Sequence, residues 1–387
     1  MNERRGFAVL WVSVCLDMVG FGLILPVLPF HAERFGASPL EITMLAASFS
    51  VAQLFAGPLV GRLGDRIGRR PILLASLAGS CASMVMLSLA DGLALMFAAR
   101  LLSGSCTNAP TAQAYVAACV EPSKRAAALG RLGAATGVGF VLGPALGGLL
   151  STPSYPGLPF VVAAVVAAVS WMLAFAWLPE VERTAGTSAG SSAPGPAARP
   201  PRRRTKLLGL ALVNFGIFAA FAAMESTFAL LVERRHGWGA AETGLVFALV
   251  GVVIVVSQAV IVGKLATWLG ELATMRVGLV LLTLGLAAIG LAPGWVGVTL
   301  GAGLVALANG LSAPTLNAMI SRRSDPAHRG ADFGLVSSAG SLARILGPLA
   351  AGVAFEALGP GSPSLLGAGV ALAIVSASVA IREPDPG

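Results

Sequence analysis

Apolar runs of about 20 residues recur along the whole chain, and this feature restricts the fold more than any other. At the 1.5 Å rise of an α-helix, such a run crosses the roughly 30 Å hydrocarbon core of a bilayer. Backbone groups in hydrocarbon must be satisfied internally, and these runs are too long for barrel strands. Only 11% of the 387 residues are charged, against roughly 25% in a soluble domain. The sequence therefore predicts an all-α, polytopic membrane protein.

Twelve predicted spans fall into two groups of six. A stretch rich in Pro, Gly, Ser and Ala, 179–206, has too little apolar surface to pack and is predicted to be a disordered cytoplasmic linker. It separates an N-terminal six-helix half, 1–178, from a C-terminal six-helix half, 207–387. The spans are predicted near 6–30, 39–60, 72–89, 92–118, 126–150, 159–178, 207–232, 242–262, 273–291, 296–320, 330–355 and 364–381.

The two halves repeat one another, with three echoes at nearly one offset. The first offset is 202 residues and the other two are 204 residues. They indicate a duplicated six-span unit and predict a central cavity between the halves near the membrane midplane. The echoes are Gly61 to Gly68 with Gly263 to Gly270, Ala109-Pro110-Thr111 with Ala313-Pro314-Thr315, and Gly143-Pro144 with Gly347-Pro348.

The basic residues set the orientation. With both termini in the cytoplasm, 21 of the 26 Lys and Arg residues lie in cytoplasmic segments, and only Arg34, Arg234 and Arg235 lie on the other face. The positive-inside rule therefore predicts cytoplasmic termini. The formal charge of +8 does not indicate nucleic-acid binding, because the basic residues are scattered in short loops and no span has a basic face.

A charged stretch follows the second span: Gly61-Arg62-Leu63-Gly64-Asp65-Arg66-Ile67-Gly68-Arg69-Arg70-Pro71. Its four arginines, one aspartate and three glycines are not expected in hydrocarbon, so a tight loop at the cytoplasmic face is predicted. Pro71 is predicted to open the next helix, because the first turn does not use its missing N–H. The alternative, which its charge alone would support, is a positive-inside anchor without a further function.

Four charged residues lie well inside predicted spans, away from the span ends: Asp17, Arg100, Glu225 and Arg344. A charge there costs roughly 2.5 to 3.5 kcal/mol on insertion scales, so by default it faces a cavity and serves a function. Three alternatives stay open. Asp17 could be a protonated carboxyl bonded to a neighbouring helix, Arg100 could snorkel to the interface, and Glu225 could line the outer end of the cavity.

The fifth span carries small residues at helical spacing. Gly139, Gly143 and Gly147 recur at intervals of four and predict one flat face for close helix packing. Pro144 is expected to kink that face, and the stretch ends with Gly147-Gly148. The other polar residues of the spans are candidates either for the cavity or for hydrogen bonds between helices: Gln53, Asn108, Gln113, Asn214, Gln258, Asn309 and Asn317.

Taken together, the chain resembles the major facilitator superfamily over nearly its whole length. The residues Gly61, Asp65, Arg66, Gly68, Arg69 and Arg70 are similar to the superfamily's signature loop between spans two and three. Gly139 through Gly148 resembles the motif of its antiporter branches, and Arg100 with Gly104 resembles a span-four motif implicated in proton transfer. Asp17 through Pro29 is similar to the twelve-span drug:proton antiporters, especially the tetracycline exporters. Those exporters carry an acidic residue in span three, where 77–84 has none.

The resemblance implies roles for the matching residues. Asp65 would meet the amino end of a helix in the other half and hold the cytoplasmic side shut, while Arg66, Arg69 and Arg70 would add pairs across this gate. Contacts made in only one conformation can bias the equilibrium between outward-open and inward-open states. Asp17 and Glu225 would accept protons, and Arg100 and Arg344 would tune their proton affinity or pair with them.

The implied function is proton-coupled efflux, by alternating access, of small amphiphilic drug-like compounds or an endogenous metabolite. A mostly apolar cavity suits such a solute better than a sugar, whose hydroxyls need many polar partners. The proton gradient would take the place of a cofactor. The resemblance also implies a multi-pass monomer in a cell membrane, the bacterial inner membrane, with small-molecule substrate, protons and lipid as its partners.

Other functions receive less support from the sequence. An uptake symporter for a small organic nutrient or ion is the alternative within the same fold, although the glycine and proline pattern of span five speaks against it. A metal enzyme or an ATP-driven pump is not expected, since no Cys, His or carboxylate cluster has metal-ligand spacing and Gly263-Lys264 is followed by Leu265. A solute-sensing receptor is expected to carry an added soluble domain, for which the 28-residue linker is too short.

Overall fold

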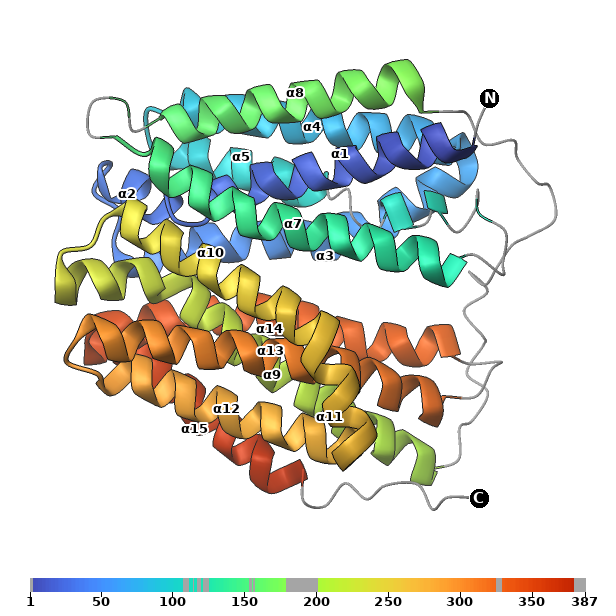
Figure 1. Cartoon of the computed structure of the whole chain (residues 1–387). Coiled ribbons are helices and arrows are strands. Elements are labelled where there is room, and N and C mark those ends of the chain that lie inside the picture. The colour runs from blue at the N-terminus through green and yellow to red at the C-terminus, as the bar shows by residue number, and fades with distance from the viewer. Residues whose placement is uncertain are drawn as a thin grey trace. The chain divides into compact units, whose positions relative to one another are not determined.

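The chain is helical along nearly all of its described length in the computed structural model (Figure 1). The structure describes residues 3–106, 111–113, 115–116, 120, 125–152, 155, 157–178, 201–324 and 329–378, with the backbone alone at 3–6, 65, 125–127, 201–206 and 329–331. In these ranges, ten helices are long and apolar enough to cross a membrane, and Leu93–Ser105 and Ser362–Ser378 are shorter apolar helices. The predicted all-α membrane fold is confirmed.

The helices belong to two compact units. Unit 1 comprises Met1–Thr184 and Val232–Val252, and unit 2 comprises Ala185–Leu231 and Val253–Gly387. The helices up to the linker are α1 (Glu3–Ile24), α2 (Leu28–Glu33), α3 (Pro39–Ile67), α4 (Arg69–Ser88), α5 (Leu93–Ser105), α7 (Arg125–Leu150) and α8 (Leu158–Trp177). Those that follow are α9 (Pro201–His236), α10 (Ala240–Val256), α11 (Val262–Leu269), α12 (Glu271–Leu291), α13 (Trp295–Arg323), α14 (Arg329–Leu358) and α15 (Ser362–Ser378).

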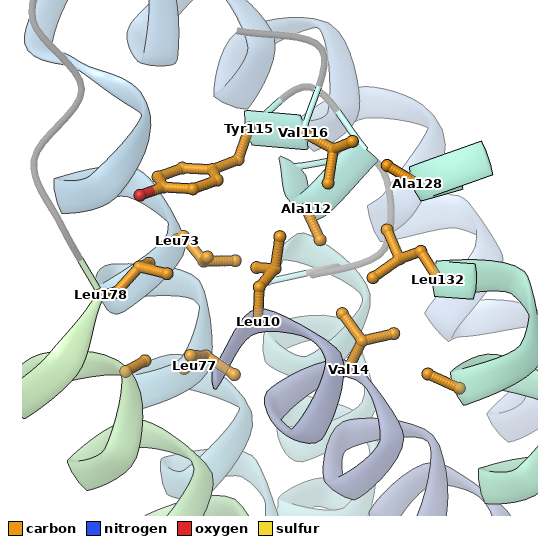
Figure 2. Close-up of a cluster of buried hydrophobic side chains, with 12 residues drawn as sticks. Leu10, Val14, Leu73, Leu77, Ala112, Tyr115, Val116, Ala128, Leu132 and Leu178 are labelled. Carbon is orange, nitrogen blue, oxygen red and sulfur yellow. The ribbon is translucent and has the colours of Figure 1, made fainter. Parts of the chain in front are cut away.

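Helix α1 lies at the centre of the unit 1 core. It packs along α7 and α8, and Figure 2 shows its side chains Leu10 and Val14 among aliphatic groups of α4, α7 and the 111–116 segment. Leu73, Leu77 and Leu132 are at most 3% exposed in this cluster. Close packing of this kind fixes the position of α1, and therefore of Asp17, in this conformation of unit 1.

The charged stretch at 61–71 is not a tight loop, and this part of the prediction was wrong. Helix α3 continues through it to Ile67, and α4 begins at Arg69 rather than at Pro71. The helices are separated only by Gly68, whose φ of 116° is a conformation that glycine adopts without a steric cost. Arginine is a good helix former, so the helix persists where the apolar sequence stops.

The predicted linker also ends earlier than expected. Helix α9 begins at Pro201, so the last six predicted linker residues, 201–206, are helical. A proline at the start of a helix is favourable because its φ is already helical and its missing N–H is not needed. The rest of the predicted linker, 179–200, lies outside the described residues.

A π-helical turn interrupts the span predicted at 242–262. Helix α10 ends at Val256, the turn η1 covers Ser257–Ile261, and α11 follows directly. The N–H of Val262 donates to the carbonyl of Ser257, five residues earlier, which is the bond that defines a π turn. Within unit 2, Ser257 packs against Gly310 of α13, where a Cβ would lie 3.3 Å from the carbonyl oxygen of Ile254.

The predicted duplication recurs in the local geometry of both units. Gly68 and Gly270 both have positive φ, 116° and 84°, and each separates two consecutive helices. Arg70 on α4 donates to the carbonyls of Leu178 and Phe175 at the end of α8, at 2.7 and 2.8 Å. Arg276 on α12 likewise donates to the carbonyl of Ser378 at the end of α15, at 2.8 Å. A guanidinium at a helix C-terminus is favoured by the helix dipole, so each arginine stabilises the end of a span.

Candidate functional site

Asp17 lines a small cavity inside unit 1. The half-buried carboxyl lies on α1, and the cavity extends to α3, α4, α5 and α8 with a volume of about 40 Å³. Pockets for drug-sized ligands measure roughly 300–1,000 Å³, so this space holds water but not a drug-like solute. Apart from Asp17 the wall is mostly apolar or weakly polar, and it includes Phe21, Phe49, Met84, Ser80, Ser103 and Cys106.

Arg100 is held in the interior of the same unit. The side chain is only 5% exposed, and its guanidinium carbon lies 4.8 Å from the centroid of the Phe49 ring. The Phe49 ring in turn lies 5.4 Å from that of Phe21 on α1. This burial does not fit an arginine that reaches the membrane interface, so the snorkelling interpretation is not supported.

Unit 2 brings its own intramembrane charges together. Glu225 on α9 lies within electrostatic reach of the Arg344 guanidinium on α14. The Arg344 guanidinium carbon lies 5.1 Å from the centroid of the Phe218 ring, and its Nη2 donates to Ser341 Oγ at 3.4 Å. In each unit, the arginine predicted to lie inside a span therefore has a phenylalanine ring at cation–π distance.

The glycine face of α7 packs as its spacing predicted. A Cβ on Gly143 would lie 2.7 Å from both Gly22 Cα and Val19 O of α1, and one on Gly139 would lie 2.5 Å from Met18 Cβ. Gly147 approaches the backbone of Leu23 still more closely. Three glycines thus let the α1 and α7 backbones touch along the segment that carries Asp17.

An adjacent face of α7 packs against α10 within unit 1. A Cβ on Gly148 would lie 2.7 Å from the carbonyl oxygen of Ala240, and one on Gly244 would lie 2.5 Å from that of Pro144. Gly251 approaches the Phe140 carbonyl oxygen similarly, at 3.1 Å. The predicted motif from Gly139 to Gly148 is therefore in contact with two helices at once.

The arginines of the charged stretch at 61–71 lie in different surroundings. Arg70 binds the end of α8 in its own unit, as described above. Arg69 lines a second cavity, of about 140 Å³, with Gly57, Gly61 and Gly64 of α3. Arg66 is exposed, and the Asp65 side chain lies outside the described atoms.

The predicted polar residues occupy different environments. Asn214 is 7% exposed and donates to the carbonyl of Val336 on α14 at 2.8 Å, which is a hydrogen bond between helices. Asn309 donates within its own helix to Val305 at 3.2 Å. Gln53 lines the 140 Å³ cavity, the exposed Gln113 lines another of about 210 Å³, and Gln258 and Asn317 are exposed. Asn108 lies outside the described residues, and no group of three or more His, Cys, Asp or Glu that could hold a metal occurs in the described ranges.

A charged cluster lies where α2 meets the end of α9 in unit 1. Arg234 Nη2 lies 3.5 Å from Glu33 Oε1. Two residues earlier on α2, His31 is 6% exposed and packs against the rings of Phe35 and Phe160 at 5.3 and 4.9 Å. Burial, together with the positive charge of Arg34, lowers the pKa of His31 from its usual 6.5.

Comparison with known proteins identifies the family. The sequence pattern of the Major Facilitator Superfamily matches residues 10–348. The chain belongs to the Major Facilitator Superfamily. It is therefore a multi-pass membrane transporter of small molecules and not an enzyme, as the sequence predicted.

Three relatives illustrate this membership. The class C tetracycline resistance protein of Escherichia coli is 29% identical over 90% of this facilitator and 89% of its own length. The class D tetracycline resistance protein of Salmonella ordonez is 34% identical over 65% of this chain, a match that spans 64% of that relative. The crystal structure of the human organic anion transporter MFSD10 (TETRAN) superposes with a TM-score of 0.73 at 25% identity, covering 98% of this chain and all of that one (100%).

Sequence reasoning missed the partners of the charged residues in this facilitator. Nothing in the spacing of Phe49, Phe218 or Leu178 distinguishes them from other apolar residues of the spans. Their partners lie on other helices, and Arg70 bonds to a residue 108 positions away. A weak signal did exist, since glycine lies one helical turn from both Arg100 and Arg344, at Gly104 and Gly340.

Proposed function

We propose that this facilitator exports small amphiphilic compounds in exchange for protons, by alternating access. The observation that carries the proposal is the position of Asp17, a half-buried carboxyl in an otherwise largely apolar cavity inside unit 1. Such a carboxyl can exchange a proton, while the aromatic and aliphatic wall suits an amphiphilic solute better than a polyol. The tetracycline resistance proteins among its relatives support export of a drug-like solute.

The 40 Å³ cavity fits this proposal if the structure is one state of a cycle. A solute of drug size needs more room, so the helices around Asp17 must separate in another state. At the glycine contacts of α7 with α1 and α10, no large side chains interdigitate, so these helices can slide past one another. Asp65 and the neighbouring arginines are proposed to bias the two states, as the family resemblance implies.

The test is solute flux in proteoliposomes with an imposed pH gradient. We expect a fluorescent lipophilic cation to move against the direction of proton flow, and Asp17→Asn to abolish the coupled proton movement because an amide cannot release a proton. Asp91→Asn, which changes an exposed carboxylate between α4 and α5, is the matched control and should behave as wild type. Glu225→Gln, measured alongside, shows whether the second carboxylate also takes part.

Two outcomes would contradict the proposal. Movement of solute and protons in the same direction would establish an uptake symporter instead. Undiminished coupling in Asp17→Asn would remove Asp17 from the mechanism. Because MFSD10 is an organic anion transporter, an anionic dye is tested in parallel, and its transport in place of the cation would assign the opposite substrate charge.

A further inference from the structure

We propose that Phe49 and Phe218 are positioning residues for proton exchange, each fixing the arginine whose charge acts on the intramembrane carboxylate of its own unit. This inference rests on the proposed function and adds two residues to it. Both phenylalanines face a guanidinium at cation–π distance, 4.8 Å for Arg100 over Phe49 and 5.1 Å for Arg344 over Phe218. Neither ring can titrate, so each acts only through the arginine that it holds.

In unit 1 the backbone brings the ring and the arginine together. Gly104 lies one turn after Arg100 on α5, and a Cβ there would clash with the Phe49 carbonyl oxygen and lie 2.9 Å from Ala52 Cβ. The absence of this Cβ lets α5 lie directly on α3 at Phe49. The Phe49 ring then has Arg100 on its face while it also lines the Asp17 cavity.

Unit 2 reaches the same arrangement by a different pair of helices. Gly340 lies one turn before Arg344 on α14, and a Cβ there would lie 3.2 Å from Phe218 Cδ2 on α9. Arg344 then lies over the ring and within electrostatic reach of Glu225. The two sites are not copies under the internal repeat, because the offset of 204 places Leu304, and not an arginine, opposite Arg100. An arginine over a phenylalanine ring therefore occurs in each unit at positions that the repeat does not relate, which favours a shared role over inheritance.

The physical role follows from the charge. A guanidinium near a carboxyl stabilises the ionised form and lowers the pH at which the proton leaves. The attraction between cation and ring is stronger away from water, so the ring restricts a long side chain that could otherwise take several rotamers. Loss of the ring would let the guanidinium leave its place, weaken its field at the carboxyl and move proton exchange to higher pH.

Few other titratable groups surround these sites. In unit 1 they are the thiols of Cys15 on α1, Cys81 on α4 and Cys106 directly after α5, whereas α3 between Glu41 and Arg62, and all of α8, have none. The guanidinium groups of these packed helices include Arg69 and Arg70 at the start of α4 and Arg131 on α7, whose backbone carbonyl accepts from Trp11 of α1. In unit 2, α9 between Leu207 and Val232 contributes only Glu225, and α15 contributes none. The remaining acids of α14, Asp332 and Glu356, lie three turns or more from Arg344.

The experiment compares pH profiles of proton exchange for Phe49→Leu, Phe218→Leu and wild type. We expect the midpoint of the pH profile to rise by about one pH unit in the leucine variant of the unit whose carboxylate couples transport to protons. Phe49→Tyr and Phe218→Tyr, which keep an aromatic face, should restore the wild-type midpoint. Phe55→Leu is the matched control, because Phe55 is on the same helix as Phe49 and is 69% exposed.

A double-variant cycle tests whether the ring acts through the arginine. Phe49→Leu should shift the midpoint in the wild-type background and add nothing to Arg100→Gln, and Phe218→Leu should behave likewise with Arg344→Gln. Unchanged midpoints in both single variants, or equal shifts in both backgrounds, would overturn the inference. The pH dependence of thermal unfolding of the purified variants provides the same midpoints without transport. Solute movement without protons in the wild type would contradict the proposed function. The unfolding midpoints would still test the present inference in that case.

Discussion

Buried polar side chains in this transporter lie in different surroundings. These surroundings decide whether the charged form of each side chain is stabilised or destabilised. Arg100 lies on an aromatic ring, which attracts its positive charge. His31 also packs against aromatic rings, yet neither ring nitrogen has a hydrogen-bond partner among the described residues. A neutral imidazole tolerates this environment, whereas an imidazolium would lose hydration without gaining an acceptor.

His31 therefore predicts a pH dependence of stability. Its pKa is lowered in the folded protein, so below the unfolded value of about 6.5 the unfolded chain binds more protons and stability falls as the pH falls. The loss is at most about 1.4 kcal/mol per pH unit. Thermal unfolding of purified protein between pH 8 and pH 5 measures it, and His31→Phe should flatten the acid side of the curve. Parallel curves for the variant and wild type would assign the acid sensitivity to other groups.

At the scale of single elements, small residues decide which helices can touch. On α7, Gly143 lies against the α1 backbone, whereas a methyl group added at Gly130 or Gly133 would have no described neighbour within 4 Å. The same residue type thus occupies two kinds of position on one helix. Glycine spacing indicated the packed face, and only the structure shows that α10 meets the neighbouring face at Gly148.

This contrast within α7 makes a matched pair of variants. Gly143→Ala should lower stability by about 1–3 kcal/mol, because the added methyl forces α1 and α7 apart. Gly133→Ala should be neutral or stabilising by up to about 1 kcal/mol, since alanine is the better helix former. Thermal unfolding in detergent compares them. Equal effects of the two substitutions would mean that α1 and α7 do not approach at Gly143 as closely as the structure shows.

The helices could be predicted from the sequence wherever local interactions determine them. Hydropathy located the spans because burial in lipid acts on each run separately, and α12 and α13 begin within two residues of their predicted starts. The charged stretch was misassigned for an equally physical reason. Charge shows where hydrocarbon ends, but a helix ends where its backbone breaks, and that break is a single glycine, Gly68. The rings under Arg100 and Arg344 were unpredictable because they depend on how separate helices pack.

At the scale of the whole molecule, the cycle requires contacts that exist in one state only. Arg70 is engaged with the end of α8 inside unit 1, and this bond needs no second state. Asp65, on the last turns of α3, remains the proposed gate residue. The repeat could be predicted from sequence because duplication leaves echoes at one offset, whereas the arginine caps at Leu178 and Ser378 leave no such trace.

Asp65→Asn should slow transport without a comparable loss of affinity. A carboxylate at a helix N-terminus is worth about 0.3–1 kcal/mol, so removal of its charge should change the rate by up to roughly fivefold. Equilibrium substrate affinity should stay within about a factor of five. Transport rate and binding are measured on the same preparation, with Asp65→Glu as the variant that keeps the charge. Full rates in Asp65→Asn would leave the stretch as a topological anchor.

The π turn at Ser257–Ile261 also changes how residues after it are assigned to a helix face. One additional residue in a turn rotates everything that follows by about 100° relative to an uninterrupted α-helix. The side chains that share one face of α10 therefore do not continue along the same face of α11. The helical periodicity of labelling at cysteines substituted along 240–269 should therefore shift at this turn. A homologue without the π turn aligns correctly only with a one-residue gap at this position.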